Sequence, residues 1–229
     1  MIDAVIFDFD GTLVATESLH FSAINDVLRP CGLELSWEEY EADYIAFDDW
    51  DFFHHRYRVA GRVLDLQQFQ CLVAEKALRF LERIRSDGVV QIPGAFDLLD
   101  LCRGEGVLVG LCTGSTRGDV DAVLARINRS VVFDVIVTAD DVERGKPDPE
   151  CYIRAMDRLR EVEPGQMVNP ARCIAVEDTA GGLKAASAAG CRTLGVTTTC
   201  PSEMLHGADR IVANFCSVAF ADLGQLVSP

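Results

Sequence analysis

The sequence predicts an α/β protein: a parallel sheet with an α-helical domain inserted after its first strand. Three observations support this prediction. An apolar run at residues 4–7 leads directly into two aspartates, residues 16–88 show helical patterns without a strand signal, and helical and strand patterns alternate from Pro93 onward. Such alternation is typical of a parallel sheet whose strands are joined by crossover helices.

The first strand is expected at residues 4–7, an apolar run that indicates burial on both faces of the sheet. Asp8 and Asp10 follow it, and Gly11 then allows the chain to turn. The i, i+2 spacing places both carboxylates on the same side of the chain. Because open parallel sheets bind ligands beyond the carboxyl ends of their strands, both aspartates are candidates for catalysis. A strand that ends in an ordinary Asp-Gly turn is the alternative.

The segment after this strand is predicted to be helical. Its candidate helices cover residues 17–29, 36–43, 49–60 and 67–86. Turn-forming residues separate them, including Gly32 and Gly61. We therefore expect one domain formed by residues 1–15 and 89–229, and a second, inserted domain formed by residues 16–88.

The remaining elements are expected to complete the sheet. Strands are predicted at residues 107–112, 133–138, 173–176 and 193–196. The helices between and beside them are predicted near residues 95–104, 117–128, 149–160 and 180–189.

The composition excludes several functional classes. A formal net charge of −15 disfavours tight binding to nucleic acid. No run of about 18 apolar residues suggests a membrane span, and Asp3 stands where a signal peptide would carry basic residues. The nine cysteines contain no Cys-x-x-Cys and are typical of reduced thiols. We expect a cytoplasmic protein without nucleic-acid or membrane partners, and a monomer is compatible with the sequence.

Polar clusters follow four of the expected strands. They contain Asp8 and Asp10, then Thr113, Gly114 and Ser115, then Lys146, and finally Glu177 and Asp178. If the strands are parallel, all four clusters meet at one edge of the sheet. Lys146 is notable there because the chain has 18 arginines but only three lysines.

This set of side chains is typical of phosphoryl transfer. Carboxylates that would otherwise repel one another can share a Mg²⁺ ion, which commonly bridges to phosphate. Lys146 adds a positive charge, while Thr113, Ser115 and nearby backbone amides can hold phosphate oxygens. Asp8 can then act as the nucleophile, and Asp10 as the general acid and base. Each cluster alone has a plainer interpretation as a turn or a helix start, so their joint occurrence carries the prediction.

The motifs also resemble those of a known superfamily. The motifs are Asp8-Phe9-Asp10-Gly11-Thr12, Thr113, Lys146-Pro147, and Glu177-Asp178 with Gly181-Gly182. In this order they resemble the four motifs of the haloacid dehalogenase-like superfamily, across essentially the whole chain. The resemblance implies a Rossmann-like core and identifies the inserted helices as a cap domain.

The resemblance also implies roles for individual residues. Asp8 would be the nucleophile, Asp10 the acid and base, and Thr113 and Lys146 would hold the phosphoryl group. The expected magnesium ligands are Asp8, Asp10, Glu177 and Asp178. The expected substrate contacts are Gly114 and Ser115, together with the cap residues Thr16, His20 and Lys76, which fall at places similar to those of β-phosphoglucomutase.

Two features indicate which branch of the superfamily the chain resembles. Halide-removing members lack the second aspartate, so Asp10 disfavours that reaction. The mutase places an arginine in the cap loop that grips a distal phosphate, whereas Ala46-Phe47-Asp48-Asp49-Trp50 contains none. We therefore expect a Mg²⁺-dependent phosphatase acting on a small phosphorylated metabolite, with sugar phosphates as candidates. A phosphosugar mutase and a non-catalytic phosphometabolite-binding protein are the alternatives.

Overall fold

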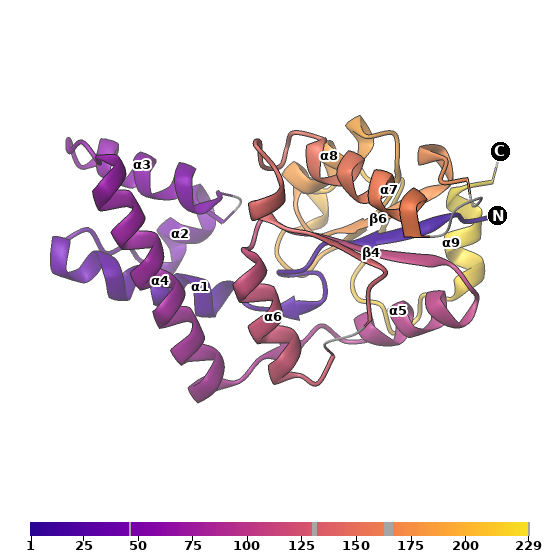
Figure 1. Ribbon diagram of the computed structural model, residues 1–229, viewed down its shortest axis with the longest axis horizontal. Helices are drawn as coiled ribbons and strands as arrows, with labels where there is room; N and C mark the ends of the chain where they lie inside the picture. The colour runs from indigo at the N-terminus through magenta and orange to yellow at the C-terminus, as the bar shows by residue number, and fades with distance from the viewer. Residues whose placement is uncertain (46, 130–131, 163–166, 229) are drawn as a thin grey trace. The chain divides into compact units, whose positions relative to one another are not determined.

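The computed structural model describes residues 1–45, 47–129, 132–162 and 167–228 (Figure 1). The chain forms two compact units. The first consists of residues 1–15, 90–117 and 129–229, and the second of residues 16–89 and 118–128. Residues 118–128 therefore group with the inserted segment, although the sequence analysis placed them in the core domain.

The first unit is built on a parallel sheet whose described strands run in the order β5-β4-β1-β6-β7-β8. Their bounds are β1 Ala4–Phe7, β4 Leu108–Cys112, β5 Val135–Val137, β6 Cys173–Glu177, β7 Arg192–Val196 and β8 Arg210–Val212. At the centre, Phe7 of β1 lies opposite Leu111 of β4 and Val176 of β6. The chain proceeds from β1 to one side and returns to β6 on the other. This reversal at β1 creates the position where such sheets bind ligands.

Helices cover the sheet of the first unit. They are α5 Ala95–Gly104, α7 Glu150–Val162, α8 Ala180–Ala188 and α9 Phe220–Leu226. Helix α7 packs on β4 and β5, and α8 packs on β6 and β7. All four residues of β1 are fully buried, as expected for a central parallel strand. The predicted α/β class with a parallel sheet is confirmed.

Several elements were not predicted. Strands β2 (Val14–Ala15) and β3 (Val90–Gln91) form a small antiparallel pair, and both are too short to show periodicity. Strand β8 is half-exposed along its length, so it lacks the apolar run of the inner strands. Helix α9 is short and contains Gly224. Short 3₁₀ segments occur at Arg29–Cys31, Ala139–Asp141, Pro170–Arg172 and Ser202–Met204.

The second unit is helical and has its own core. Its helices are α1 Glu17–Leu28, α2 Trp37–Asp43, α3 Asp49–Val59 and α4 Leu66–Asp87, with most of α6 Arg117–Arg126. Helices form at all four places predicted in the insertion. Buried apolar and aromatic side chains join them, among them Leu28, Phe52, Phe53 and Tyr57. Within the described ranges, no helix combines the length and the apolar character needed to cross a membrane.

Candidate active site

The candidate site lies at the carboxyl ends of β1, β4 and β6 in the first unit. Asp8 directly follows β1, and its backbone N–H donates to Val176 O at 2.9 Å. Thr113 follows β4 in the same way, and Glu177 is the last residue of β6. Parallel pairing in register therefore brings these strand ends together. Lys146 joins them from the loop that precedes α7.

The Lys146 ammonium connects three of these segments. Its Nζ donates to Asp8 Oδ1 at 2.6 Å and to Glu177 Oε1 at 2.6 Å. It also donates to the backbone carbonyl of Cys112 at 3.0 Å. A lysine ammonium has three donors, so these contacts match its full capacity. Because charge-assisted bonds are stronger than neutral ones, they hold Lys146 firmly between the two carboxylates.

The charges at the site perturb one another. Burial alone would lower the pKa of Lys146, but the Asp8 and Glu177 carboxylates outweigh it and hold that pKa well above its usual value. Burial raises the pKa of Asp8 well above its usual value, more than the ammonium lowers it. Repulsion from Glu177 and Asp178 raises the pKa of Asp8 further. The site therefore has more negative charge than Lys146 neutralises.

A group of carboxylates at the site fits a divalent cation. Asp8, Glu177 and Asp178 each offer an oxygen within 4.8 Å of the others. Thr12 Oγ1 donates to Asp178 Oδ1 at 3.2 Å and orients that side chain. Carboxylate oxygens are the ligands that Mg²⁺ prefers, and a cation here would favour the ionised form of Asp8. The donor chemistry and the surplus of negative charge both fit Mg²⁺.

Asp10 has a different environment from these three carboxylates. Its Oδ2 accepts hydrogen bonds from Ser115 Oγ at 2.6 Å and from Thr113 Oγ1 at 3.3 Å. The Thr113 hydroxyl also accepts from the Ser115 backbone N–H at 3.0 Å. The two hydroxyls that the sequence analysis assigned to phosphate thus hold Asp10. Their contact with phosphate, and that of the neighbouring Gly114, stay predictions, as does the assignment of Asp10 to the metal.

Two glycines allow the close packing around the acidic groups. Gly11 has φ +76°, and a Cβ there would come within 2.0 Å of Asp178 Oδ2. At Gly182 a Cβ would meet the Glu177 carboxylate at 2.0 Å. Both positions lie in motifs identified from the sequence. Glycine is required at each of these positions because any side chain would occupy the space of a carboxylate.

The predicted cap residues all belong to the second unit. Thr16 precedes α1 and is fully buried. The His20 ring stacks on Phe80, with ring centroids 4.1 Å apart and planes 11° from parallel. Lys76 Nζ donates to Asp49 Oδ1 at 2.8 Å. The role of Thr16, His20 and Lys76 in substrate binding stays a prediction.

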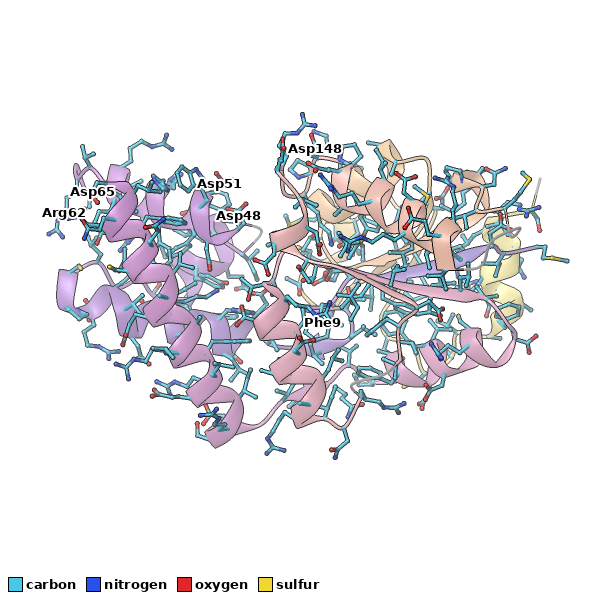
Figure 2. All side chains as sticks on the ribbon, viewed as in Figure 1. Phe9, Asp48, Asp51, Arg62, Asp65 and Asp148 are labelled. Carbon is cyan, nitrogen blue, oxygen red and sulfur yellow. The ribbon has the colours of Figure 1, made fainter. Side chains whose placement is uncertain are left out.

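The loop that lacks an arginine leads into α3. Ala46 lies outside the described residues. Asp48 caps the helix by accepting from the Asp51 backbone N–H at 2.8 Å, and burial raises the pKa of Asp48 despite this bond. In Figure 2, Asp48 and Asp51 lie at one end of α3, and Arg62 lies beyond its other end. An α-helix rises about 1.5 Å per residue, so most of α3 lies between Asp48 and this arginine, although Asp51 and Arg62 line one pocket.

Two side chains without a predicted role contact the site: Tyr152, which was not identified from the sequence, and Thr12, which was named only as part of the first motif. The Tyr152 hydroxyl donates to Glu177 Oε1 at 2.7 Å, and the Thr12 hydroxyl binds Asp178. Tyr152 lies on the buried face of α7 with Cys151, Ala155 and Met156. A signal was present, because a tyrosine on an apolar helix face needs a partner for its hydroxyl. The identity of that partner depends on the tertiary structure.

Comparisons with known proteins agree with this geometry. A sequence model described as haloacid dehalogenase-like hydrolase matches residues 2–190. Protein CbbY of Rhodobacter capsulatus is 32% identical over 220 residues, which cover 93% of this chain and 92% of that protein. Validoxylamine A 7'-phosphate phosphatase of Streptomyces hygroscopicus subsp. limoneus is 29% identical over 235 residues, which cover 98% of this chain and 99% of that protein.

A solved structure extends the likeness to three dimensions. A CbbY variant from Rhodobacter sphaeroides in complex with xylulose-(1,5)bisphosphate has a TM-score of 0.86 at 27% identity, covering 97% of this chain and 99% of that one. These findings confirm the predicted superfamily and enzyme class, a phosphoric monoester hydrolase. The chain therefore belongs to the haloacid dehalogenase-like hydrolase family.

Proposed function

We propose that this chain is a cytoplasmic, Mg²⁺-dependent phosphatase that hydrolyses a small phosphorylated metabolite through a phosphorylated Asp8. The observation that carries the proposal is the Lys146 ammonium, bonded at 2.6 Å to both Asp8 and Glu177. An ammonium fixed beside a carboxylate at the switch point of a parallel sheet can neutralise an incoming phosphoryl group.

The proposed reaction has two displacements at phosphorus. An Asp8 carboxylate oxygen attacks, the bond from phosphorus to the leaving oxygen breaks, and Asp10 gives that oxygen a proton. Asp10 then takes a proton from water, and the water oxygen attacks the phosphoryl-aspartate. The bond from phosphorus to Asp8 breaks, so inorganic phosphate leaves and the Asp8 carboxylate is restored. The hydroxyls of Thr113 and Ser115 support these roles by orienting Asp10.

The acidic group supports the proposed metal dependence. Asp8, Glu177 and Asp178 would hold Mg²⁺, with Asp10 as the further predicted ligand. When bound, Mg²⁺ supplies the positive charge that lets a phosphate dianion approach several carboxylates. Lys146 contributes the charge that the protein itself provides, and it stays protonated because its pKa is held well above the usual value.

We infer that residues 16–88 act as a cap that selects substrates with one phosphate. The start of α3 offers Asp48, Asp49 and Asp51, which would repel a second phosphate. Lys76 pairs with Asp49 at 2.8 Å, so part of its charge is already balanced. A distal phosphate would call for a guanidinium, whose planar fork matches phosphate geometry. The Rhodobacter sphaeroides CbbY variant binds xylulose-(1,5)bisphosphate. This bisphosphate is therefore the most direct test of whether the present chain prefers substrates with one phosphate.

Phosphate release should be measured with Mg²⁺ and with EDTA over a panel of sugar monophosphates, together with xylulose 1,5-bisphosphate. We expect release from monophosphates that requires Mg²⁺. Full activity in EDTA would contradict the metal dependence, and a strong preference for the bisphosphate would contradict the proposed selection. A second assay should add β-glucose 1-phosphate with a catalytic sugar bisphosphate. Efficient formation of glucose 6-phosphate with little free phosphate would favour the mutase.

A further inference from the structure

Tyr152 contacts both members of the ion pair between Lys146 and Glu177. Its hydroxyl donates to Glu177 Oε1 at 2.7 Å, and the same oxygen accepts from Lys146 Nζ at 2.6 Å. The ammonium lies 5.3 Å from the centroid of the tyrosine ring, within the range of a cation–π attraction. Tyr152 is 0% exposed, and its hydrogen bond to Glu177 is buried, so water does not weaken that bond.

We propose that Tyr152 is a positioning residue for phosphoryl transfer, an inference that rests on the proposed function. Its hydroxyl fixes the Glu177 carboxylate, and its ring attracts the Lys146 ammonium. Together the two contacts keep Lys146 on Asp8, where the phosphoryl group is proposed to bind. Tyr152 acts through these neighbours and has no assigned contact with the substrate.

The need for such a residue follows from competition for one ammonium. Asp8 Oδ1 and Glu177 Oε1 both lie 2.6 Å from Lys146 Nζ, so the two carboxylates attract it at equal distance. In a buried site each attraction is strong. The Tyr152 hydroxyl satisfies part of the Glu177 charge and so weakens the pull on Lys146 from that side. Without the hydroxyl, we expect the ammonium to shift from Asp8 toward Glu177.

The packing of α7 makes Tyr152 a rigid support. Its neighbours Cys151 and Met156 are almost fully buried, and Ala155 is fully buried. The Cys112 thiol donates to the Cys151 carbonyl at 3.1 Å, which joins the start of α7 to the end of β4. Cys112 also supplies the backbone carbonyl that binds Lys146. Tyr152 and Lys146 are therefore both anchored to the end of β4, Tyr152 through α7 and Lys146 through the Cys112 carbonyl.

The test uses Tyr152→Phe, which keeps the ring and removes the hydroxyl. We expect kcat for a small phosphomonoester to fall about 10-fold or more, the usual cost of losing a residue that supports a site. KM should change by less than about 3-fold, because the loss concerns the transition state. Affinity for vanadate, a transition-state analogue, should fall in parallel with kcat, while affinity for inorganic phosphate should change little.

A matched control is Tyr40→Phe. The Tyr40 hydroxyl donates to Glu17 Oε2 at 2.8 Å in the second unit, so this variant also removes a tyrosine–glutamate bond. We expect it to keep the wild-type kcat. Thermal unfolding of both variants shows whether the mutated chains are folded. If Tyr152→Phe is less stable, its kinetics are measured below the onset of its thermal unfolding, where the chain is folded.

A double mutant separates positioning from a general loss of structure. With Lys146→Ala already present, Tyr152→Phe should lower kcat no further, because the positioned group is gone. The inference is overturned if Tyr152→Phe has wild-type kcat, or if it costs the same factor with and without Lys146. In contrast, a wild-type protein that releases no phosphate from any substrate, or Lys146→Ala with full turnover, would overturn the proposed function itself.

Discussion

Two of the three lysines are buried against carboxylates, one in each unit, and the two environments differ in the origin of their acidic groups. Lys146 binds Asp8 and Glu177, which come from the ends of different strands. Lys76 binds Asp49, which lies in the first turn of α3. The side chains of the two lysines are 14% and 8% exposed, so burial does not distinguish the candidate catalytic lysine from the other.

The difference lies in how the negative charge is balanced. Asp49 and Asp51 lie in the first turn of a helix and Asp48 caps it, where backbone N–H groups and the helix dipole favour carboxylates. The acidic groups around Lys146 come from separate strand ends, and burial with mutual repulsion raises the pKa of Asp8. We therefore infer that the surplus of negative charge around Lys146, and not the burial of the lysine, distinguishes the candidate metal and phosphate site.

The largest expected effect is that of Asp8→Asn. We expect phosphate release to fall by at least about 10³-fold, because an amide is a poor nucleophile. Steady-state phosphate release checks this, with Asp157→Asn as the control. Asp157 is an exposed partner of Arg160 on α7, and its replacement should leave turnover unchanged. Wild-type turnover in Asp8→Asn would mean that the carboxylate beside Lys146 is not the nucleophile. Lys146 would then have no stronger claim to a catalytic role than Lys76.

The two lysines should differ in which kinetic constant they control. Lys146→Ala should raise the barrier by about 2–4 kcal/mol, equivalent to roughly 30- to 900-fold in kcat, because one fixed electrostatic group is lost. Lys76→Ala should alter KM more than kcat, because the predicted role of Lys76 is to contact the substrate. Full kinetics of both variants with one monophosphate give the comparison. A large kcat effect at Lys76 with none at Lys146 would reverse the assignment.

Gly182 tests how tightly the acidic groups are packed. In Gly182→Ala the new Cβ would meet the Glu177 carboxylate at 2.0 Å, so we expect a loss of about 1–3 kcal/mol in the free energy of unfolding and lower kcat. Gly181→Ala is the matched control, since a Cβ there meets nothing within 4 Å. It should be neutral or slightly stabilising, because alanine favours a helix over glycine. Chemical denaturation of both variants measures the difference, and equal stabilities would contradict the close packing.

The smallest expected effect concerns an ion pair outside both lysine environments. The hydrogen bond from Arg158 lowers the pKa of Asp141 to about 2 from the ordinary 3.8. A depressed carboxylate pKa stabilises the folded state above the unfolded pKa, and the contribution disappears as the pH falls from about 4 toward 2. Because Arg158 is 40% exposed, solvent screening reduces the effect to about 1 kcal/mol at neutral pH.

The measurement is the free energy of unfolding of wild type and Asp141→Asn at pH 7 and near pH 2.5. We expect wild type to be the more stable protein at pH 7 and the difference to shrink in acid. A difference that stays constant over this range would show that the charge of Asp141 does not contribute.

The inner strands and the helices could be predicted because their patterns are local. Residues 4–7 are apolar since β1 is buried on both faces, and α3 begins at the expected residue because Asp48 caps it. Strand β8 and the pair formed by β2 and β3 could not be predicted. Their pairing depends on distant neighbours, and segments of two or three residues carry no periodic signal.

At the site, the sequence indicated which residues come together, but not which hydrogen bonds they form. Asp8, Lys146 and Glu177 meet in the structure because parallel strands end at one edge of the sheet. The hydroxyl of Ser115 was assigned to phosphate, yet it binds Asp10. Tyr152 was missed altogether. Which oxygen accepts from which donor depends on side-chain rotamers, and these are set by packing between elements far apart in sequence.

The pairing of β2 with β3 has a consequence for evolution and engineering. Val14 lies opposite Gln91, and the Ile92 N–H donates to Leu13 O at 2.9 Å. The chain thus leaves and re-enters the first unit at hydrogen-bonded neighbours. The entropy of closing a loop grows slowly, by about 0.6 kcal/mol for each doubling of its length. Residues 16–89 therefore begin and end at one place on the first unit, although residues 118–128 share their compact unit. We expect that a segment grafted between residues 15 and 90 would leave the register of the sheet unchanged.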